Sequence, residues 1–252
     1  MNSKEPSLKP MSYNYLMPLG MLFITTLLAA NYTAQKPIAI LGFIMPGGIF
    51  IFPMVFILGD IVSEVYGYKW TRRMIYYAAA CSILIAAYIK VIVMARPADF
   101  WTQAPAFEEV FRMSWLIFTV SIVSFILAGL ANSFLLTKLK ILVNGRYYWT
   151  RAISSTIVAV VVDNLIFIPI VFYDASTLSE KLRMSCGMFV VKVGYELLSL
   201  PFMSRIVGYL KHRENIDTYD RGTNFSPFVI DIAYDDANLY LKNVVLLNGP
   251  AK

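Results

Sequence analysis

Four acidic side chains lie inside long apolar stretches of the sequence, where a charge is costly. Asp60 and Glu64 are four residues apart in "LGDIVSEVYGYKW", Asp163 follows "IVAVVV", and Glu196 follows Lys192 by four residues. An ionisable group at the centre of a bilayer costs at least about 2.5–3.5 kcal/mol, so it normally faces a protein interior or a water-filled cavity. These residues therefore predict a polar site inside a membrane protein.

Helical periodicity gathers the polar residues of two stretches into two narrow stripes. At about 100° per residue, residues spaced by three, four or seven positions share one face of a helix. The stripes are Pro53, Asp60, Glu64 and Gly67, and Ser185, Lys192, Glu196 and Ser199. We expect each stripe to face the interior of a bundle, and the remaining surface of the first helix to be compatible with lipid.

The composition supports a helical membrane protein. The chain has 252 residues, of which 58% are hydrophobic and 15% charged, whereas a soluble domain has about 25% charged residues. Six apolar runs reach or approach the roughly 20 residues that a helix needs to cross a bilayer. The runs are Asn14–Tyr32, Ile49–Tyr66, Met74–Met94, Trp115–Leu139, Ala152–Tyr173 and Met184–Leu210. The predicted fold class is an all-α membrane protein, a bundle of six transmembrane helices.

Basic residues predict the orientation of these spans, because cytoplasmic loops are enriched in Lys and Arg. The segments expected in the cytoplasm hold Lys4, Lys9, Lys69, Arg72, Arg73, Lys138, Lys140, Arg146, Arg151, Arg205, Lys211 and Arg213. The external loops hold Lys36, Arg96, Arg112, Lys181 and Arg183, several of them beside acids. Both termini are therefore expected in the cytoplasm, and the net charge of +6 needs no nucleic-acid partner to explain it.

The order of the spans suggests two domains. Residues 1–210 are expected to form the transmembrane transport domain, and residues 211–252 a cytoplasmic C-terminal tail. Three spans on either side of a long loop, residues 96–114, are compatible with two inverted three-helix halves. The first run also resembles a secretory signal, but it is too long for one and five further spans follow. We expect "GFIMPGG", Gly42–Gly48, to form an external turn or re-entrant segment.

Depth along the spans separates the charged residues. Asp163 and Glu196 fall near the middle, Asp60 slightly toward the cytoplasm, and Glu64 about one turn from the cytoplasmic end. Lys192 lies toward the outside, at the spacing of an intrahelical ion pair with Glu196. The other acids have no second basic residue at their depth, which predicts an acidic surplus. Such a surplus must be protonated, hydrated or matched by a bound cation or hydrogen-bond donor, as in transporters.

These arguments give a set of candidate site residues. The predicted substrate-binding residues are Asp60, Asn132, Asp163, Asn164, Lys192 and Glu196, and the predicted gating or proton-coupling residues are Glu64 and Arg151. The amides of the two asparagines are equally suited to hydrogen-bonding helices together. Cys81, Cys186 and His212 have no metal-ligand spacing around them, so we expect no metal site, cofactor or catalytic residue.

Several motifs together resemble the queuosine precursor transporter family, also called the vitamin uptake transporter family. They are "GDIVSEVYGY" at Gly59–Tyr68, Arg151 opening a span that contains Asp163, a lysine and a glutamate in the sixth span, and "ENIDTYDRGTNFSPF" at Glu214–Phe228. The resemblance runs from about Asn14 to Phe228. The tail departs from the family pattern, because Ser226 stands where the family has asparagine before Pro-Phe, and the chain continues beyond it.

The resemblance implies a bacterial inner-membrane carrier that imports 7-deazaguanine bases, the precursors of queuosine in transfer RNA. Its partners would be this small-molecule substrate and membrane lipid, with a homodimer left open. The carboxylate of Asp163 or Glu196 is suited to accept two parallel bonds from a guanine-like face. Asn164 or Asn132 would then read the base carbonyl. Tyr195 or Phe167 would stack on the ring.

Two other classes of protein fit parts of the pattern. A substrate-capture subunit would need a separate ATP-driven partner, since the chain has no GxxxxGK[ST] loop of its own. An intramembrane aspartyl protease would use Asp60 and Asp163 as a dyad. The sequence lacks the serine, histidine and metal constellations of other enzymes and the glycine-rich acid motifs of such proteases, so we expect no enzymatic activity.

Overall fold

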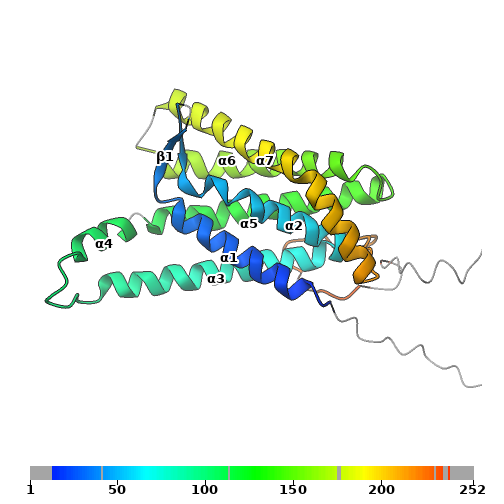
Figure 1. The fold of residues 1–252 in the computed structure, drawn as a ribbon, viewed down its shortest axis with the longest axis horizontal. Coiled ribbons are helices and arrows are strands. Elements are labelled where there is room, and N and C mark those ends of the chain that lie inside the picture. The colour runs from blue at the N-terminus through cyan, green and yellow to red at the C-terminus, as the bar shows by residue number, and fades with distance from the viewer. Residues whose placement is uncertain are drawn as a thin grey trace, which may run out of the picture.

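Six helices of the structure are long and apolar enough to cross a membrane, which confirms the predicted fold class (Figure 1). The structure is a computed structural model that describes residues 13–40, 42–112, 114–174, 177–229, 231–234 and 238. The helices run roughly along one common direction and pack side by side. The arrangement of two inverted halves remains a prediction.

The elements follow one another as six long helices with a short hairpin and a short helix between them. In chain order they are α1 (Leu16–Thr33), β1 (Pro37–Ile40), β2 (Phe43–Pro46), the 3-10 turn η1 (Gly47–Phe50), α2 (Pro53–Tyr66), α3 (Tyr68–Met94), α4 (Ala104–Arg112), α5 (Ser114–Leu142), α6 (Tyr148–Val171) and α7 (Leu178–Arg213). At 1.5 Å per residue, the 36 residues of α7 extend about 54 Å. This helix is therefore longer than the hydrocarbon core, and α4 was not predicted.

The central helix of the bundle is α2. It packs against α1, α3, α5 and α7, and every residue from Leu58 to Tyr66 is buried. The surface that was expected to be compatible with lipid thus packs largely against neighbouring helices. Apolar side chains such as Val62, which is 0% exposed, serve equally well against lipid tails or against neighbouring helices, so hydropathy alone does not distinguish a central helix from a peripheral one.

Gly42–Gly48, predicted as an external turn or re-entrant segment, contains the second strand of a β-hairpin and the start of η1. β1 and β2 pair antiparallel, with Pro37 opposite Pro46 and Ile40 opposite Phe43. Gly48 in η1 lies so close to α1 that a Cβ there would collide with the carbonyl of Ala30. The absence of a side chain at Gly48 thus lets η1, which follows the hairpin, pack directly against α1.

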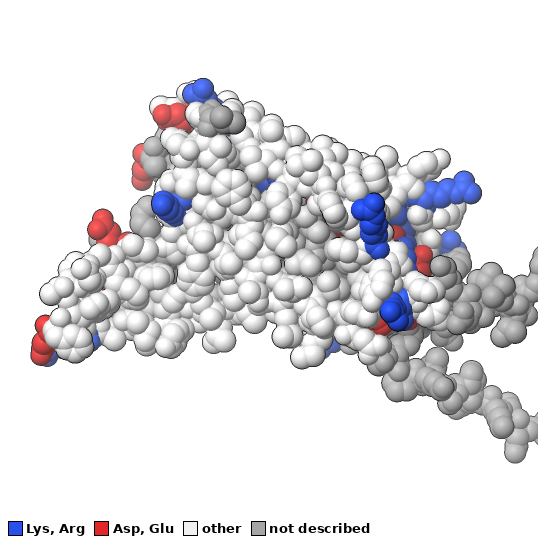
Figure 2. Space-filling view, viewed as in Figure 1, with Lys and Arg blue, Asp and Glu red and all other residues white. Residues whose placement is uncertain are grey.

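The two described ends of the chain meet at the opposite end of the bundle (Figure 1). The backbone N–H of Tyr15 donates to the Glu214 carboxylate over 2.8 Å. Figure 2 shows Lys and Arg gathered around this end and a nearly uncharged band across the middle of the visible face. By the positive-inside rule this is the cytoplasmic, or inner, end, and the hairpin lies at the outer end.

Residues 216–229 and 231–234 pack against the inner end of the bundle. The buried guanidinium of Arg72 donates to the carbonyls of Asn224, Ser226 and Asp231, at 3.2, 2.7 and 3.1 Å. Tyr68 donates its hydroxyl to the carbonyl of Phe225 over 3.0 Å. The part of the predicted tail that the structure describes is thus held to α3 by hydrogen bonds.

This segment also explains why α3 begins six residues earlier than predicted. The first N–H groups of a helix have no partner within the helix. Here the N–H of Tyr68 donates to the Asp220 carboxylate over 2.9 Å and that of Lys69 to the Tyr234 hydroxyl over 2.9 Å. Burial raises the pKa of the Asp220 carboxyl above its ordinary value.

Gly67, between α2 and α3, is a point where substitution should weaken the fold. Its φ is +89°, and a Cβ would collide with the Tyr234 hydroxyl and the Thr218 side chain. We expect Gly67→Ala to cost about 1–3 kcal/mol in unfolding free energy from the backbone alone, because φ +89° with ψ 173° lies in a region open essentially only to glycine. The matched control is Gly194→Ala in α7, where nothing lies within 4 Å of the added Cβ. A thermal unfolding midpoint in detergent that is unchanged in Gly67→Ala would contradict this role.

Candidate functional site

Polar side chains inside the bundle form three layers between the outer and inner ends. The outer layer contains Asp163 and Lys192, the middle layer Asp60 and Glu196, and the inner layer Glu64 with its basic partners. The helices supply each layer from several directions, so residues distant in sequence come together. The predicted site residues are thereby separated into groups with different surroundings.

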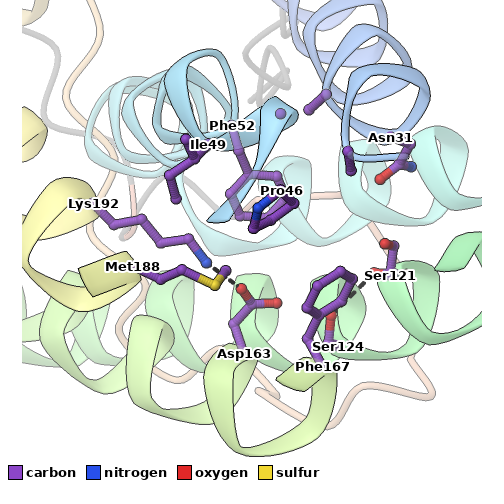
Figure 3. A pocket seen from close by; sticks show the side chains of 13 residues that line it. Asn31, Pro46, Ile49, Phe52, Ser121, Ser124, Asp163, Phe167, Met188 and Lys192 are labelled. Carbon is purple, nitrogen blue, oxygen red and sulfur yellow. Dashed lines mark hydrogen bonds and ion pairs between the residues drawn. The ribbon is translucent and has the colours of Figure 1, made fainter. Parts of the chain in front are cut away.

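The outer layer lines a cavity beneath the hairpin (Figure 3). The space between the protein atoms at this cavity is about 380 Å³ when the open solvent at its mouth is included. It is lined by residues of α1, β2, η1, α5, α6 and α7: Ala30, Asn31, Ala34, Pro46, Gly48, Ile49, Phe52, Ser121, Ser124, Asp163, Phe167, Met188 and Lys192. Most of these are apolar, and Asp163 and Lys192 are the charged residues among them, as in pockets where a few polar groups orient a ligand.

Asp163 and Lys192 form an ion pair across the interface between α6 and α7. The Lys192 ammonium donates to Asp163 Oδ2 over 2.5 Å, and the two side chains point toward one another in Figure 3. The ammonium also lies 3.5 Å from Asn164 Oδ1, while Asn164 Nδ2 donates to the carbonyl of Ser185 over 3.1 Å. Three of the predicted substrate-binding residues therefore belong to one hydrogen-bonded group.

This pairing corrects two expectations. Lys192 pairs with Asp163 on the neighbouring helix and makes no ion pair with Glu196 within the described residues. Asp163 therefore has a basic partner at its depth. Spacing along one helix shows which side chains share a face. It does not show which residue of the next helix lies opposite, and here that residue, Asp163, is the partner of Lys192.

The middle layer lies about one to two helical turns closer to the inner end. Glu196 follows Lys192 by one turn of α7, and Asn132 follows Ser124 by about two turns of α5. Asn132 Nδ2 donates to Asp60 Oδ1 over 2.5 Å. Asp60 is 0% and Glu196 1% exposed, and neither lines the outer cavity. The structure thus separates Asp60, Asn132 and Glu196 from the other three predicted substrate-binding residues.

The inner layer is a network of ion pairs centred on Glu64. Arg151 donates Nη1 to Glu64 Oε2 over 2.8 Å and Nη2 to Oε1 over 3.3 Å. The ammonium of Lys211 lies 2.7 Å, and that of Lys140 3.5 Å, from Glu64 Oε1. Asp217 then bridges the two lysines, at 2.6 Å from Lys140 and 2.9 Å from Lys211. Glu64 therefore belongs to no acidic surplus, contrary to expectation.

The inner layer contains residues that sequence reasoning did not assign to the site. Lys69, the first basic residue after Glu64 in the sequence, pairs with Asp231 instead, and this hydrogen bond lowers the pKa of the Asp231 carboxyl. Lys140 entered the prediction only as a cytoplasmic charge, yet its side chain is 1% exposed. The sequence signal for Asp217 was the motif that contains it, because this motif is acidic and directly follows the basic residues at the cytoplasmic end of the sixth span.

The protease hypothesis finds no support in this geometry. A carboxylate dyad requires two acids to share one site. Asp60 bonds to Asn132, whereas Asp163 bonds to Lys192 in a different layer. The described residues also contain no group of three or more His, Cys, Asp or Glu side chains that could hold a metal ion.

These features define a multi-pass α-helical membrane protein with a polar cavity inside its bundle. Residues 46–206 match the sequence model of a family described as putative vitamin uptake transporters. Because the match covers more than half of the chain, the protein belongs to this family.

The protein is also 25% identical, over 201 residues, to a protein of Escherichia coli (strain K12) named queuosine precursor transporter. That alignment covers 79% of this chain and 87% of the relative. No solved structure matches significantly.

The inner network gives a stability prediction for Glu64→Gln. This change leaves the buried cations of Arg151 and Lys140 without their carboxylate, and breaking a buried ion pair typically costs about 3–5 kcal/mol. We expect a lower thermal unfolding midpoint and less monodisperse protein on size-exclusion chromatography. The control is Asp99→Asn, which breaks a pair with Arg96 whose side chains are 92% and 87% exposed and should change little. Equal midpoints for the two variants would contradict the role of Glu64.

Proposed function

We propose that this protein imports queuosine precursor bases, the 7-deazaguanines, across the bacterial inner membrane by alternating access. The observation that carries the proposal is the Asp163–Lys192 pair in the wall of the outer cavity. The name of the Escherichia coli relative and the description of the family support the class of substrate. The position of the cavity between the hairpin and the closed inner network supports entry from outside.

The ion pair has the donor and acceptor pattern that a guanine-like edge requires. Such an edge presents a carbonyl acceptor beside two N–H donors. The Lys192 ammonium supplies donors for the carbonyl, and the two oxygens of Asp163 accept the N–H groups in parallel. Substrate binding would then insert the base edge between the two side chains. Asn164, which already lies beside Lys192, would hold the ammonium during this exchange.

Aromatic side chains provide a second element of recognition. Phe167, which was predicted as a stacking residue, lines the cavity, as does Phe52 just before α2, whereas Tyr195 does not. The Lys192 ammonium lies 4.8 Å from the centre of the Phe52 ring. A planar base between Phe52 and Phe167 would stack on one or both rings, and aromatic stacking contributes about 1–3 kcal/mol per base.

Alternating access requires the inner layer to open after the base has bound. In the described conformation the network of Glu64 and Arg151 joins α2 to α5, α6 and α7 and closes the path to the cytoplasm. Opening would separate Glu64 from one or more of its cations while they gain water at the inner surface. We therefore propose that Glu64 and Arg151 form the inner gate, with Lys140, Lys211 and Asp217 as further members.

Uptake by the purified protein tests the substrate class. In liposomes that contain only this chain, labelled 7-deazaguanine should enter, and unlabelled 7-deazaguanines should compete better than adenine. Competition by adenine equal to that of the 7-deazaguanines would contradict the proposed recognition of the base edge. Uptake that required an added ATP-driven protein would instead favour a substrate-capture subunit.

Variants of the ion pair test the proposed binding site. Asp163→Asn and Lys192→Met each remove one charge-assisted partner, and such bonds contribute about 1.5–3 kcal/mol. We expect each variant to lower the affinity for base by about tenfold or more, as measured by uptake against base concentration. The controls Asp174→Asn and Lys181→Met change the same residue types at an exposed and a half-buried external position, neither of which lines the cavity. Unaltered affinity in folded Asp163→Asn protein would refute the placement.

A further inference from the structure

The two acids of the middle layer lack the partners that buried carboxylates normally have. Asp60 Oδ2 and both carboxylate oxygens of Glu196 are buried and accept no hydrogen bond from any described residue. A buried charge without a partner is strongly unfavourable, so such a group takes up a proton or binds a cation. These two side chains are therefore suited to hold a cation inside the membrane.

The side chains around the two acids present oxygen atoms to them. The hydrogen bond from Asn132 to Asp60 uses the amide nitrogen and leaves Asn132 Oδ1 buried without a partner. The Tyr148 hydroxyl also has no partner among the described residues. The helices that carry these side chains are neighbours, because α2 packs against α5 and α7, and α6 packs against the same two helices. Residues of α2, α5, α6 and α7 thus converge on one oxygen-rich site.

The basic residues nearest to this site are already engaged with other acids. Lys192, one turn outward on α7, is bonded to Asp163. Arg151, one turn inward, is bonded through both terminal nitrogens to Glu64. Neither cation makes an ion pair with Asp60 or Glu196 in the part of the chain that the structure describes, so the positive charge that these acids require must come from outside the protein.

We propose that Asp60 and Glu196 form a cation-coupling site at which one proton, shared between the two carboxylates, is carried inward with each substrate molecule. The proton binds from the outer side while the inner network is closed. It is released to the cytoplasm when that network opens and water reaches the pair. Asn132 acts as a positioning residue that orients Asp60. This inference rests on the proposed transport function and identifies the proton gradient as the driving force for uptake of the base.

The position of the site links proton binding to the state of the inner gate. The pair lies between the substrate cavity and the inner gate, in the path along which both must pass. When both acids are ionised, their mutual repulsion and lack of solvation disfavour the closed, packed arrangement of α2 against α7. When one proton is bound, that penalty is relieved. Glu64 is unsuited to this role because three basic side chains hold it in its ionised form.

The first experiment asks whether the pair holds a proton, independently of any substrate. Infrared difference spectra of the purified protein at neutral pH should contain the C=O stretching band of a buried carboxylic acid. The band should shift in Asp60→Asn and Glu196→Gln and remain in the controls Asp99→Asn and Glu109→Gln, whose acids are exposed. A wild-type spectrum with no such band, or with a band that both variants leave unchanged, would overturn the proposal.

The second experiment separates coupling from substrate binding in liposomes of the single protein. With one coupled proton, an inward gradient of one pH unit should support about tenfold accumulation of labelled base in wild type. Asp60→Asn and Glu196→Gln should still exchange labelled for unlabelled base without a gradient, but should accumulate none. A sodium gradient at equal pH should have no effect.

Each other outcome identifies which inference fails. Accumulation driven by sodium and not by pH would overturn the proton as the coupled cation. Loss of exchange in folded Asp60→Asn and Glu196→Gln would place these residues in the substrate site and overturn a separate coupling site. If wild type neither exchanges nor accumulates any 7-deazaguanine, the proposed function fails, and the infrared measurement alone decides whether the pair holds a proton.

Discussion

The ionised carboxylate of Glu64 is the interaction on which the arrangement of the bundle depends. It lies on the central helix α2, is 2% exposed, and pairs with basic residues of α5, α6 and α7. A lone acid at this depth would destabilise α2 in the membrane, and the buried cations of Lys140 and Arg151 without an acid would destabilise their own helices. Together they hold four helices in one relative position, and Asp217 balances part of the remaining positive charge.

The three polar layers differ in how completely their charges are paired. The balance between acidic and basic groups therefore changes from the outer to the inner end of the bundle. The outer pair is matched one to one and lies in a cavity wall, so a ligand that offers both donors and acceptors can replace its bonds. The middle acids are unmatched within the described residues. The inner network contains more basic than acidic side chains, and Asp217 connects it to the segment after α7. In the transport cycle that we propose, a substrate moving inward would pass from the outer ion pair, along the middle acids, to the basic inner network.

The sequence predicted the helices and the polar stripes, but it did not predict which residues meet across helices. Hydropathy located six spans because length and apolar composition are local properties, and periodicity correctly turned Lys192 and Glu196 inward. The Asp163–Lys192 pair depends on the rotation of α6 against α7, which no local pattern encodes. The early start of α3 at Tyr68 depends on Asp220, which lies 152 residues away in sequence.

The hairpin and Lys140 show two further limits of local patterns. β1 and β2 are four residues each and rich in the same apolar residues as the spans, so they gave no distinct signal. The sequence position of Lys140, among other basic residues after an apolar run, is typical of a cytoplasmic loop. Its side chain is buried because the segment at residues 216–220 folds over it. The motif that contains Asp217 contributed to the family resemblance, but the resemblance did not indicate which residues Asp217 contacts.

The separation of Glu64 from Lys211 has a consequence for how the protein is made. The two residues are 147 positions apart, and at about 5–20 residues per second a ribosome needs roughly 7–30 s to add that length. During this interval α2 has entered the membrane while its last basic partner has not been synthesised. The nascent chain therefore passes through an assembly state in which the central acid is only partly neutralised, and the bundle becomes a single locked unit only after the end of α7 emerges.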